Sequence, residues 1–387
     1  MFGTSSGAAG VHNRRVVIDA IRVNGALSRA ALARATKLAK QTLSNIIDDL
    51  EREGLVIARE VVKEGRGKPA MPYDLAPFGA FSIGLQIDRH LAHCVVVDFL
   101  GRVVLRRETS LAVRDPETGF RTLCTLIGES LEELARLHPK GDERVLGLGV
   151  AMPGPFGLRG ANMTDDDYTM ARWQEYPLIA NLEKETGLEA SLQNDAGAAA
   201  TAEKLTGRAH GLRSAACIYL GYGLGAGLII NGELFSGRDG NAGEIGMIPS
   251  PFAKRRGTTL EQNVSLNALC DAFALDRKDM RLFARIEDLL ANGGEQVEDW
   301  IVSAANHLDW AADLLQLTLS PEGVILCGTA PPALIERLVA HVNARRKPAG
   351  KQGLLSGKAD PWIVAIGAAA EPISRSFDPR YSALLKN

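Results

Sequence analysis

Residues 215–246 read AACIYLGYGLGAGLIINGELFSGRDGNAGEIG and decide the fold of most of this chain. The apolar segment 215–219 predicts a buried β-strand, and the glycine series at 221–227 predicts a tight loop. Residues 228–230 predict a second strand, which ends at a turn formed by Asn231 and Gly232. This stretch therefore predicts a glycine-rich β-meander.

A similar pattern occurs earlier in the chain. Three strand-like segments occur at 83–87, 94–98 and 103–105. An amphipathic helix follows at 116–138, and a buried strand at 145–155 enters a glycine-proline turn. Two strand meanders separated by helices predict a duplicated α/β body with a cleft between its halves.

Upstream of this body, the sequence predicts three helices. Apolar residues at helical spacing and a stop at Gly25 predict a first helix at 13–24, and Ser28 is expected to cap a second helix. A polar turn at 36–37 precedes a third helix, which ends at Gly54. Its buried face is formed by Leu43, Ile46, Ile47 and Leu50.

A hairpin follows the third helix. Strand-like segments at 55–62 and 70–75 flank a glycine-rich basic tip at 63–68. Three helices and such a wing predict a winged helix-turn-helix that binds double-stranded DNA. Ala39 departs from this pattern, because a Ser or Thr cap is usual there and its loss costs ~1 kcal/mol.

The predicted DNA contacts lie at the start of the second helix, in the first half of the third helix and in the wing. They are Arg29, Lys40, Gln41, Thr42, Ser44, Asn45, Arg66 and Lys68. Residues 1–75 carry a net charge of +4, which leaves −6 for the rest of a chain whose total is −2. The alternative is an ordinary solvated helix face followed by a surface turn.

Length and composition limit the class of protein. A chain of 387 residues with 46% hydrophobic and 23% charged residues predicts two or three globular domains. No apolar run approaches the roughly 20 residues of a membrane-spanning helix, so no membrane partner is expected. Residues 1–10 are interpreted as a frayed tail rather than a signal peptide, which predicts a cytoplasmic location. The five cysteines lack a CxxC pattern, so reduced thiols are expected.

Four motifs make this chain resemble the ROK family of repressors, open reading frames and kinases. They are the Met-Pro-Gly-Pro turn at 152–155, Asn-Asp-Ala at 194–196, the glycine series at 221–227 and Asn-Ala-Gly-Glu-Ile-Gly at 241–246. The resemblance implies an actin-like (ribonuclease H-like) ATPase fold with two lobes behind the winged helix. We therefore expect a DNA-binding domain at 1–76 and a ROK domain at 77–387. Its lobes are expected at about 77–195 plus the C-terminal helix, and at 196–360.

The resemblance also implies a sugar-binding site. Asn194, Asp195, Glu244 and Glu261 match family residues that contact sugar hydroxyls. In the kinases, the aspartate that matches Asp195 is the catalytic base. Carboxylates and carboxamides suit this task because sugar hydroxyls are hydrogen-bond donors that these groups accept. The alternatives are a helix cap at Asn194-Asp195 and a solvated loop acid at Glu244.

Other family positions have changed. The loop that holds Mg²⁺ and phosphate in the kinases has become Gln86, Asp88, Arg89 and His90, and Tyr222 replaces a threonine of the second glycine loop. Because an acidic side chain here repels a polyphosphate, phosphoryl transfer is not expected and Asp195 is interpreted as a vestigial base. The zinc ligands of the family have become Met247, Phe252, Lys254 and Thr259. We expect neither a metal nor a cofactor.

Together these features predict a DNA-binding regulator, a repressor that senses a sugar or sugar phosphate without phosphorylating it. A homodimer or homotetramer is expected, with helices near 296–317 at its contact surface. One alternative is a ROK sugar kinase with a regulatory head. Another is a ligand-binding module that has lost its affinity for DNA.

Overall fold

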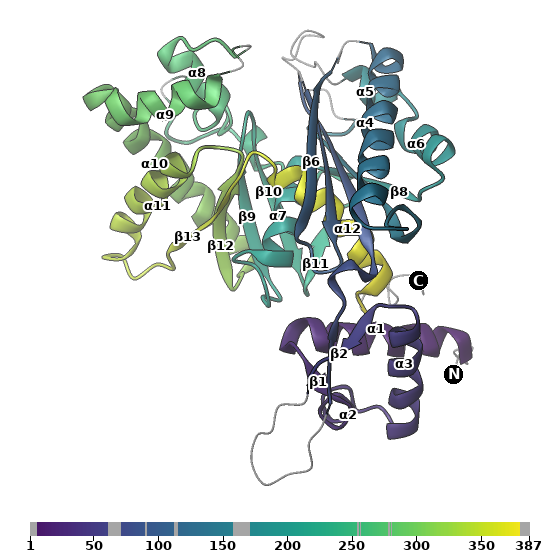
Figure 1. Cartoon of the computed structure of the whole chain (residues 1–387). Helices are drawn as coiled ribbons and strands as arrows, with labels where there is room; N and C mark the ends of the chain where they lie inside the picture. The colour runs from purple at the N-terminus through teal and green to yellow at the C-terminus, as the bar shows by residue number, and fades with distance from the viewer. Residues whose placement is uncertain are drawn as a thin grey trace.

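The computed structural model describes residues 6–60, 71–89, 91–111, 115–157, 171–253, 255, 257–277, 279 and 281–379. A small helical head carries a larger α/β body with two lobes (Figure 1). Each lobe contains one five-stranded sheet. This arrangement confirms the predicted fold class.

The head is a winged helix-turn-helix. Its elements are α1 (Ser6–Asn24), β1 (Leu27–Ser28), α2 (Arg29–Thr36), α3 (Lys40–Arg52), β2 (Val56–Ala58) and β3 (Pro72–Leu75). Ser28 caps α2 as predicted, since its hydroxyl accepts a hydrogen bond from the Ala31 amide. Ala39 makes no side-chain cap, also as predicted. The wing tip at 63–68, with Arg66 and Lys68, lies outside the described residues.

Two features of the head differ from the prediction. Helix α1 begins at Ser6, so the frayed tail predicted through Gly10 is wrong for residues 6–10. Alanines at positions 8 and 9 favour a helix, and the two glycines, at positions 7 and 10, cost only about 1 kcal/mol each. The short strand β1 was not predicted; its Leu27 pairs with Tyr73 of β3.

The first lobe is built on a sheet of strand order β6-β5-β4-β7-β8. The strands are β4 (Phe81–Ile87), β5 (Leu91–Asp98), β6 (Val103–Ser110), β7 (Val145–Met152) and β8 (Ala190–Asn194). The helices are α4 (Pro116–Leu137), α5 (Ala171–Glu175) and α6 (Leu178–Thr186), with 3-10 turns η1 (Pro77–Gly79) and η2 (Asp142–Arg144). Strand β4 is buried at every position, which matches its apolar sequence.

The second lobe repeats this topology with the order β11-β10-β9-β12-β13. The strands are β9 (Ala215–Leu220), β10 (Leu224–Ile230), β11 (Glu233–Phe235), β12 (Gly323–Gly328) and β13 (Leu354–Ala359). The helices are α8 (Leu266–Phe273), α9 (Leu282–Asn292), α10 (Gly294–Leu319) and α11 (Pro332–Arg346), with a 3-10 turn η3 (Ile245–Met247). In both sheets the third, second, first, fourth and fifth strands lie side by side, which confirms the predicted duplication.

Two helices, α7 (Asp195–Thr206) and α12 (Ile363–Phe377), lie between the sheets (Figure 1). Glycines allow backbones to touch at these contacts. A Cβ added to Gly84 would lie 1.9 Å from the carbonyl oxygen of Ala365, and one added to Gly367 would lie 1.7 Å from that of Ala198. Helix α12 therefore packs directly on the first sheet and on α7, with no room for side chains.

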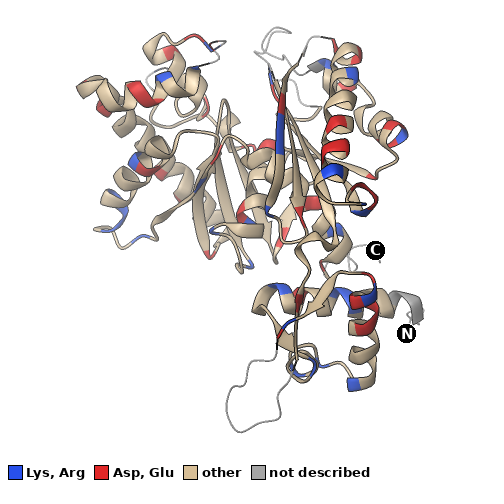
Figure 2. Cartoon of the chain, viewed as in Figure 1, with Lys and Arg blue, Asp and Glu red and all other residues tan. Residues whose placement is uncertain are grey.

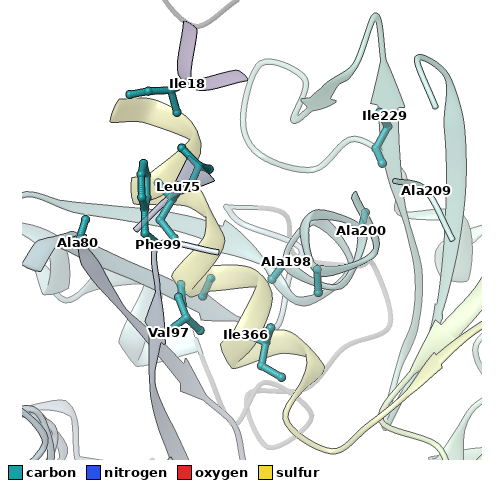
Figure 3. Close-up of a cluster of buried hydrophobic side chains, with 14 of the residues drawn as sticks. Ile18, Leu75, Ala80, Val97, Phe99, Ala198, Ala200, Ala209, Ile229 and Ile366 are labelled. Atoms are coloured by element: carbon teal, nitrogen blue, oxygen red, sulfur yellow. The ribbon is translucent and has the colours of Figure 1, made fainter. Parts of the chain in front are cut away.

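One hydrophobic core extends from the head into the body. It includes Ile18 of α1, Leu75 of β3, Phe99, Ala198 of α7 and Ile366 of α12 (Figure 3). These residues are almost fully buried. The head is consequently packed against the body rather than held by an extended linker.

Two arginines of α1 strengthen this contact. Arg15 donates to backbone carbonyl groups at the end of α12, and Arg22 donates to the carbonyl oxygen of Phe99 at 3.2 Å. The Arg22 guanidinium also lies over the Phe99 ring, 5.2 Å from its centre. Both arginines contribute to the basic charge of the head, but the body binds them.

All five cysteines are free thiols, as predicted, and only Cys124 is partly exposed. Among the helices described, none combines the length and the apolar character that crossing a bilayer requires.

Candidate functional site

The last residue of β8 and the first residue of α7 form the floor of the candidate site. Asn194 caps α7, because its Oδ1 accepts a hydrogen bond from the Gly197 amide at 2.7 Å. Its Nδ2 donates to Oε1 of Glu244 at 3.4 Å. The helix cap considered from the sequence is real, yet it leaves the amide group directed at a second predicted site residue.

Asp195 has an unusual environment. Its Oδ1 is enclosed, and none of the described residues offers it a hydrogen bond. Burial raises the pKa of Asp195 well above its ordinary value, and the charge of Asp88 raises it further. The charge of Arg89 opposes this shift. A buried acceptor without a partner is suited to a ligand hydroxyl group.

Glu244 and Glu261 approach this floor from the second lobe. Burial raises the pKa of Glu244 to about 7, while the hydrogen bond from Asn194 lowers it and the charge of Glu261 raises it. Oε2 of Glu261 accepts a hydrogen bond from the Leu224 amide at 2.9 Å. The four predicted sugar-binding residues therefore lie together at the junction of the two lobes.

Glycines make room for both glutamates. A Cβ on Gly154, in the turn after β7, would lie 2.5 Å from Oε1 of Glu244. A Cβ on Gly223, in the second glycine loop, would lie 2.7 Å from Oε2 of Glu261. The glycine motifs thus contact the carboxylates directly, and substituting either glycine would displace them.

Asn241 joins the two lobes at this site, and sequence analysis did not assign it a role. Its Nδ2 donates to the carbonyl oxygen of Phe156 at 2.8 Å, and its Oδ1 accepts from the Phe156 amide at 2.6 Å. The side chain pairs with that backbone as a neighbouring strand would. Its position at the start of the 241–246 motif was the only available signal.

The altered loop after β4 is filled by protein groups. Oε1 of Gln86 lies 3.2 Å from Nδ1 of His93, whose ring packs on Trp362 with centres 4.2 Å apart. The Arg89 guanidinium lies 5.7 Å from the centre of the Tyr222 ring. His90 lies outside the described residues. The Gln86 amide is therefore paired inside the protein.

The positions at which the resemblance led us to expect no zinc ligands lie near a buried histidine. Met247 and Phe252 are exposed, and Lys254 lies outside the described residues. Oγ of Ser250 lies 2.5 Å from Nδ1 of the buried His307, and the Phe252 ring meets the His307 ring edge-on. The Ser250 hydroxyl also accepts a hydrogen bond from the Phe252 amide, and burial lowers the pKa of His307 below its ordinary value.

The predicted DNA-contacting side chains of the head fall into two groups. Lys40, Gln41, Thr42 and Asn45 are exposed on α3. Arg29, by contrast, donates to Ser44, to Asp48 at 2.5 Å and to the Tyr73 hydroxyl at 2.9 Å. Burial is the largest influence on the pKa of Arg29 and lowers it, but the bonds to Asp48 and Tyr73 leave it raised overall.

The basic charge of the head is distributed unevenly. Basic and acidic residues both occur along its helices (Figure 2), and Arg14 pairs with Glu53. Within the described part of the head, exposed cations without an ion-pair partner gather around the turn between α2 and α3: Arg34, Lys37 and Lys40. This turn is the part of the head best suited to contact phosphate groups.

A winged-helix head joined to a duplicated actin-like body defines the class of protein. The ROK family model matches residues 82–348, and a MarR family model matches residues 16–67. This chain belongs to the ROK family.

Several relatives are named as repressors. The xylose repressor of Caldicellulosiruptor bescii is 29% identical over 235 residues, which are 60% of this chain and 57% of that protein. The DNA-binding transcriptional repressor Mlc of Escherichia coli is 26% identical over 236 residues, 60% of this chain and 56% of Mlc. The matches therefore span less than two thirds of these relatives.

Solved structures share the fold. A ROK family transcriptional regulator, described as a homolog of E. coli Mlc, has a TM-score of 0.72 at 21% identity. The match covers 97% of this chain and 98% of that structure. A ROK family glucokinase from Streptomyces griseus, solved with glucose and AMPPNP, has a TM-score of 0.57 at 22% identity. It matches 75% of this chain and 98% of its own.

Proposed function

We propose that this protein is a DNA-binding transcription regulator, a repressor, whose body binds a sugar effector without phosphorylating it. The observation that carries the proposal is the position of α7. Its first residue, Asp195, lies at the candidate sugar site, and its last turn, at Lys204, faces α1 of the head across a cavity of about 210 Å³. We propose that ligand binding acts on the position of the head through this helix.

The site itself supports recognition of hydroxyl groups. Hydrogen-bond acceptors gather here from four side chains: Asn194, Asp195, Glu244 and Glu261. Oδ1 of Asp195 accepts no hydrogen bond from the described residues. The relatives named xylose repressor make D-xylose the first sugar to test. The proposal includes the division of the chain into a DNA-binding domain at 1–76 and a ROK domain at 77–387.

The same site argues against the kinase alternative. Gln86 is engaged by His93, and Asp88 adds negative charge close to Asp195. Transfer of a phosphoryl group requires cations that neutralise the polyphosphate, and these replacements do not supply them. Arg89 is a cation of the same loop, but its charge acts on Asp195.

A two-fold assembly is part of the proposal. Winged helices that read palindromic half-sites act in pairs. Helix α10 carries Leu317, whose side chain is 86% exposed. We propose that α10 contributes to the contact between subunits. Light scattering of the wild type and of Leu317→Glu tests this, and an unchanged mass would contradict it.

The function is tested by two measurements on the full chain. Thermal shift against a panel of sugars should reveal one that raises the melting temperature, because a ligand of the native state stabilises it. DNA fragments selected from the genome should bind with an affinity that this sugar changes and that falls with salt. Sugar-dependent ATP turnover that disappears in Asp195→Asn would instead establish a kinase.

A further inference from the structure

A second cavity opens beside the candidate sugar site. Its volume is about 740 Å³, and both lobes form its walls. The first lobe contributes the end of β7, β8, α5 and α6, and the second lobe contributes the loop 236–240. Of the residues described above for the candidate site, Phe156 also lines this cavity.

The end of β7 and the turn after it lie between the cavity and the sugar site. Met152, in the wall of the cavity, pairs in register with Asn194. Phe156, also in the wall, is the residue whose backbone Asn241 binds. The intervening Gly154 touches Glu244. A ligand seated on Asn194 and Glu244 would therefore have the cavity next to it.

The walls are mainly aromatic and aliphatic. Phe156, Tyr176 and Leu192 line the cavity, and Leu192, on the edge strand β8, is 41% exposed. Ring contacts hold Tyr176 in place: its ring centre lies 5.8 Å from that of Phe120 and 6.1 Å from that of Trp173. A fixed aromatic surface of this kind suits the flat, apolar face of a ring.

Polar groups occur at a few defined points. Gln174 is fixed by two bonds to the turn after β7, since it donates to the Pro155 carbonyl at 3.0 Å and accepts from the Gly157 amide at 3.2 Å. Arg238 lies 3.6 Å from Asp239, and both side chains are exposed. Glu175 and Ser236 also belong to the lining, so the cavity combines an apolar surface with polar and charged groups.

We propose that this cavity is a second subsite, which binds a ring attached to the sugar, so that the effector is a glycoside or disaccharide rather than a free monosaccharide. This inference rests on the proposed function of the neighbouring site. The volume lies in the upper half of the range for sites that bind drug-sized ligands, and a single sugar on Asn194 and Glu244 would leave it empty.

The test compares two derivatives of the same sugars. Methyl glycosides and 4-nitrophenyl glycosides of D-xylose, D-glucose, D-mannose and D-galactose have the same linkage but differ in the attached ring. For the sugar that binds, the 4-nitrophenyl glycoside should bind ~10-fold more tightly in calorimetry, the gain expected from burying roughly 60 Å² of apolar surface. Equal affinities would overturn the inference.

A pair of variants places the effect in the cavity. Leu192→Ala should reduce the preference for the 4-nitrophenyl glycoside by several fold. Leu355→Ala is the matched control, because Leu355 is also 41% exposed but lies on β13 of the second lobe. A preference that survives Leu192→Ala unchanged would overturn the assignment. Binding of free sugars without any glycoside would overturn the second subsite alone, whereas binding of neither would overturn the proposed function as well.

Discussion

The Arg15 guanidinium on α1 donates a hydrogen bond to the carbonyl oxygen of Ser376, near the end of α12, at 3.0 Å. A second bond reaches the Arg375 carbonyl at 2.9 Å. The last carbonyl groups of a helix have no partner within it and carry partial negative charge, so a cation stabilises them. Arg15 therefore acts as a cap that the head supplies to a helix of the body.

Removing this cap should weaken the coupling between head and body. Arg15→Met keeps the apolar stem but loses the donors, and we expect a loss of ~1–3 kcal/mol in the free energy of unfolding. The change in DNA affinity caused by the sugar should also become smaller. Arg52→Met is the control, because Arg52 is 73% exposed and pairs only with Asp49 of its own helix. An undiminished sugar effect in Arg15→Met would disprove the coupling.

Lys40 and Arg29 should behave differently in DNA binding. Lys40→Ala is expected to weaken binding and to lower the slope of log affinity against log salt by about 1, because one phosphate contact is lost. Its melting temperature should not change. Arg29→Ala should lower both affinity and melting temperature, since Arg29 also ties α2 to Asp48 and Tyr73. Lys184→Ala on α6 is the control, and an equal effect there would count against the proposed surface.

Asn241→Ala should open the junction of the lobes. It removes two hydrogen bonds to the Phe156 backbone, and we expect a loss of ~1–3 kcal/mol in unfolding free energy and about tenfold weaker sugar binding. Calorimetry and thermal unfolding measure both effects. Asn263→Ala is the control, because Asn263 donates only to Thr259 in its own loop. Similar losses in the two variants would refute a specific role for Asn241.

Glu244 makes stability depend on pH in a defined direction. Its pKa is about 7 in the folded protein and 4.5 when unperturbed, so the folded protein binds more protons between these values. Stability is therefore lost as pH rises through this window, by up to ~3 kcal/mol. Glu244→Gln should be more stable than the wild type at pH 8 but not at pH 4.5. Glu287→Gln, at an exposed position of α9, should show no such difference.

His307 should have the opposite dependence. Burial lowers its pKa below the ordinary value of 6.5, so the folded protein binds fewer protons than the unfolded chain. Stability is then lost as pH falls below 6.5. His307→Gln should reduce the difference in melting temperature between pH 7 and pH 5, whereas His210→Gln, at an exposed position, should not. If the melting temperature of His307→Gln depended on pH as strongly as that of the wild type, the buried His307 that contacts Ser250 would not be the source of this dependence.

Much of the fold was predictable because local patterns determined it. Apolar runs broken by glycine turns identified the repeated strands, and the Asn194-Asp195 and 241–246 motifs identified residues that the structure brings together. The packing of head on body was not predictable. The apolar face around Ile18 shows that α1 is buried on one side but not what covers it. Arg15 and Arg22 look like surface cations in the sequence, because only tertiary structure reveals the carbonyl groups that bind them.

The cavity lined by Leu192 and the role of Asn241 share this limit. Each depends on residues from both lobes, and nothing in the spacing of the 241–246 motif indicates that Asn241 meets the backbone of residue 156. Contacts of this kind depend on how the lobes approach each other, which the period of a strand or helix does not encode.

Helix α7 has 12 residues, so it is about 18 Å long. Its Asp195 end and its Lys204 end belong to the same short rigid segment, which Gly227 and Gly367 hold at backbone contact on two sides. Under the proposed function, a segment so short and so closely held would move as a unit, so a ligand that shifts Asp195 would also shift the Lys204 end, which faces α1 across the cavity. The path proposed within the body is then about three turns of one helix long.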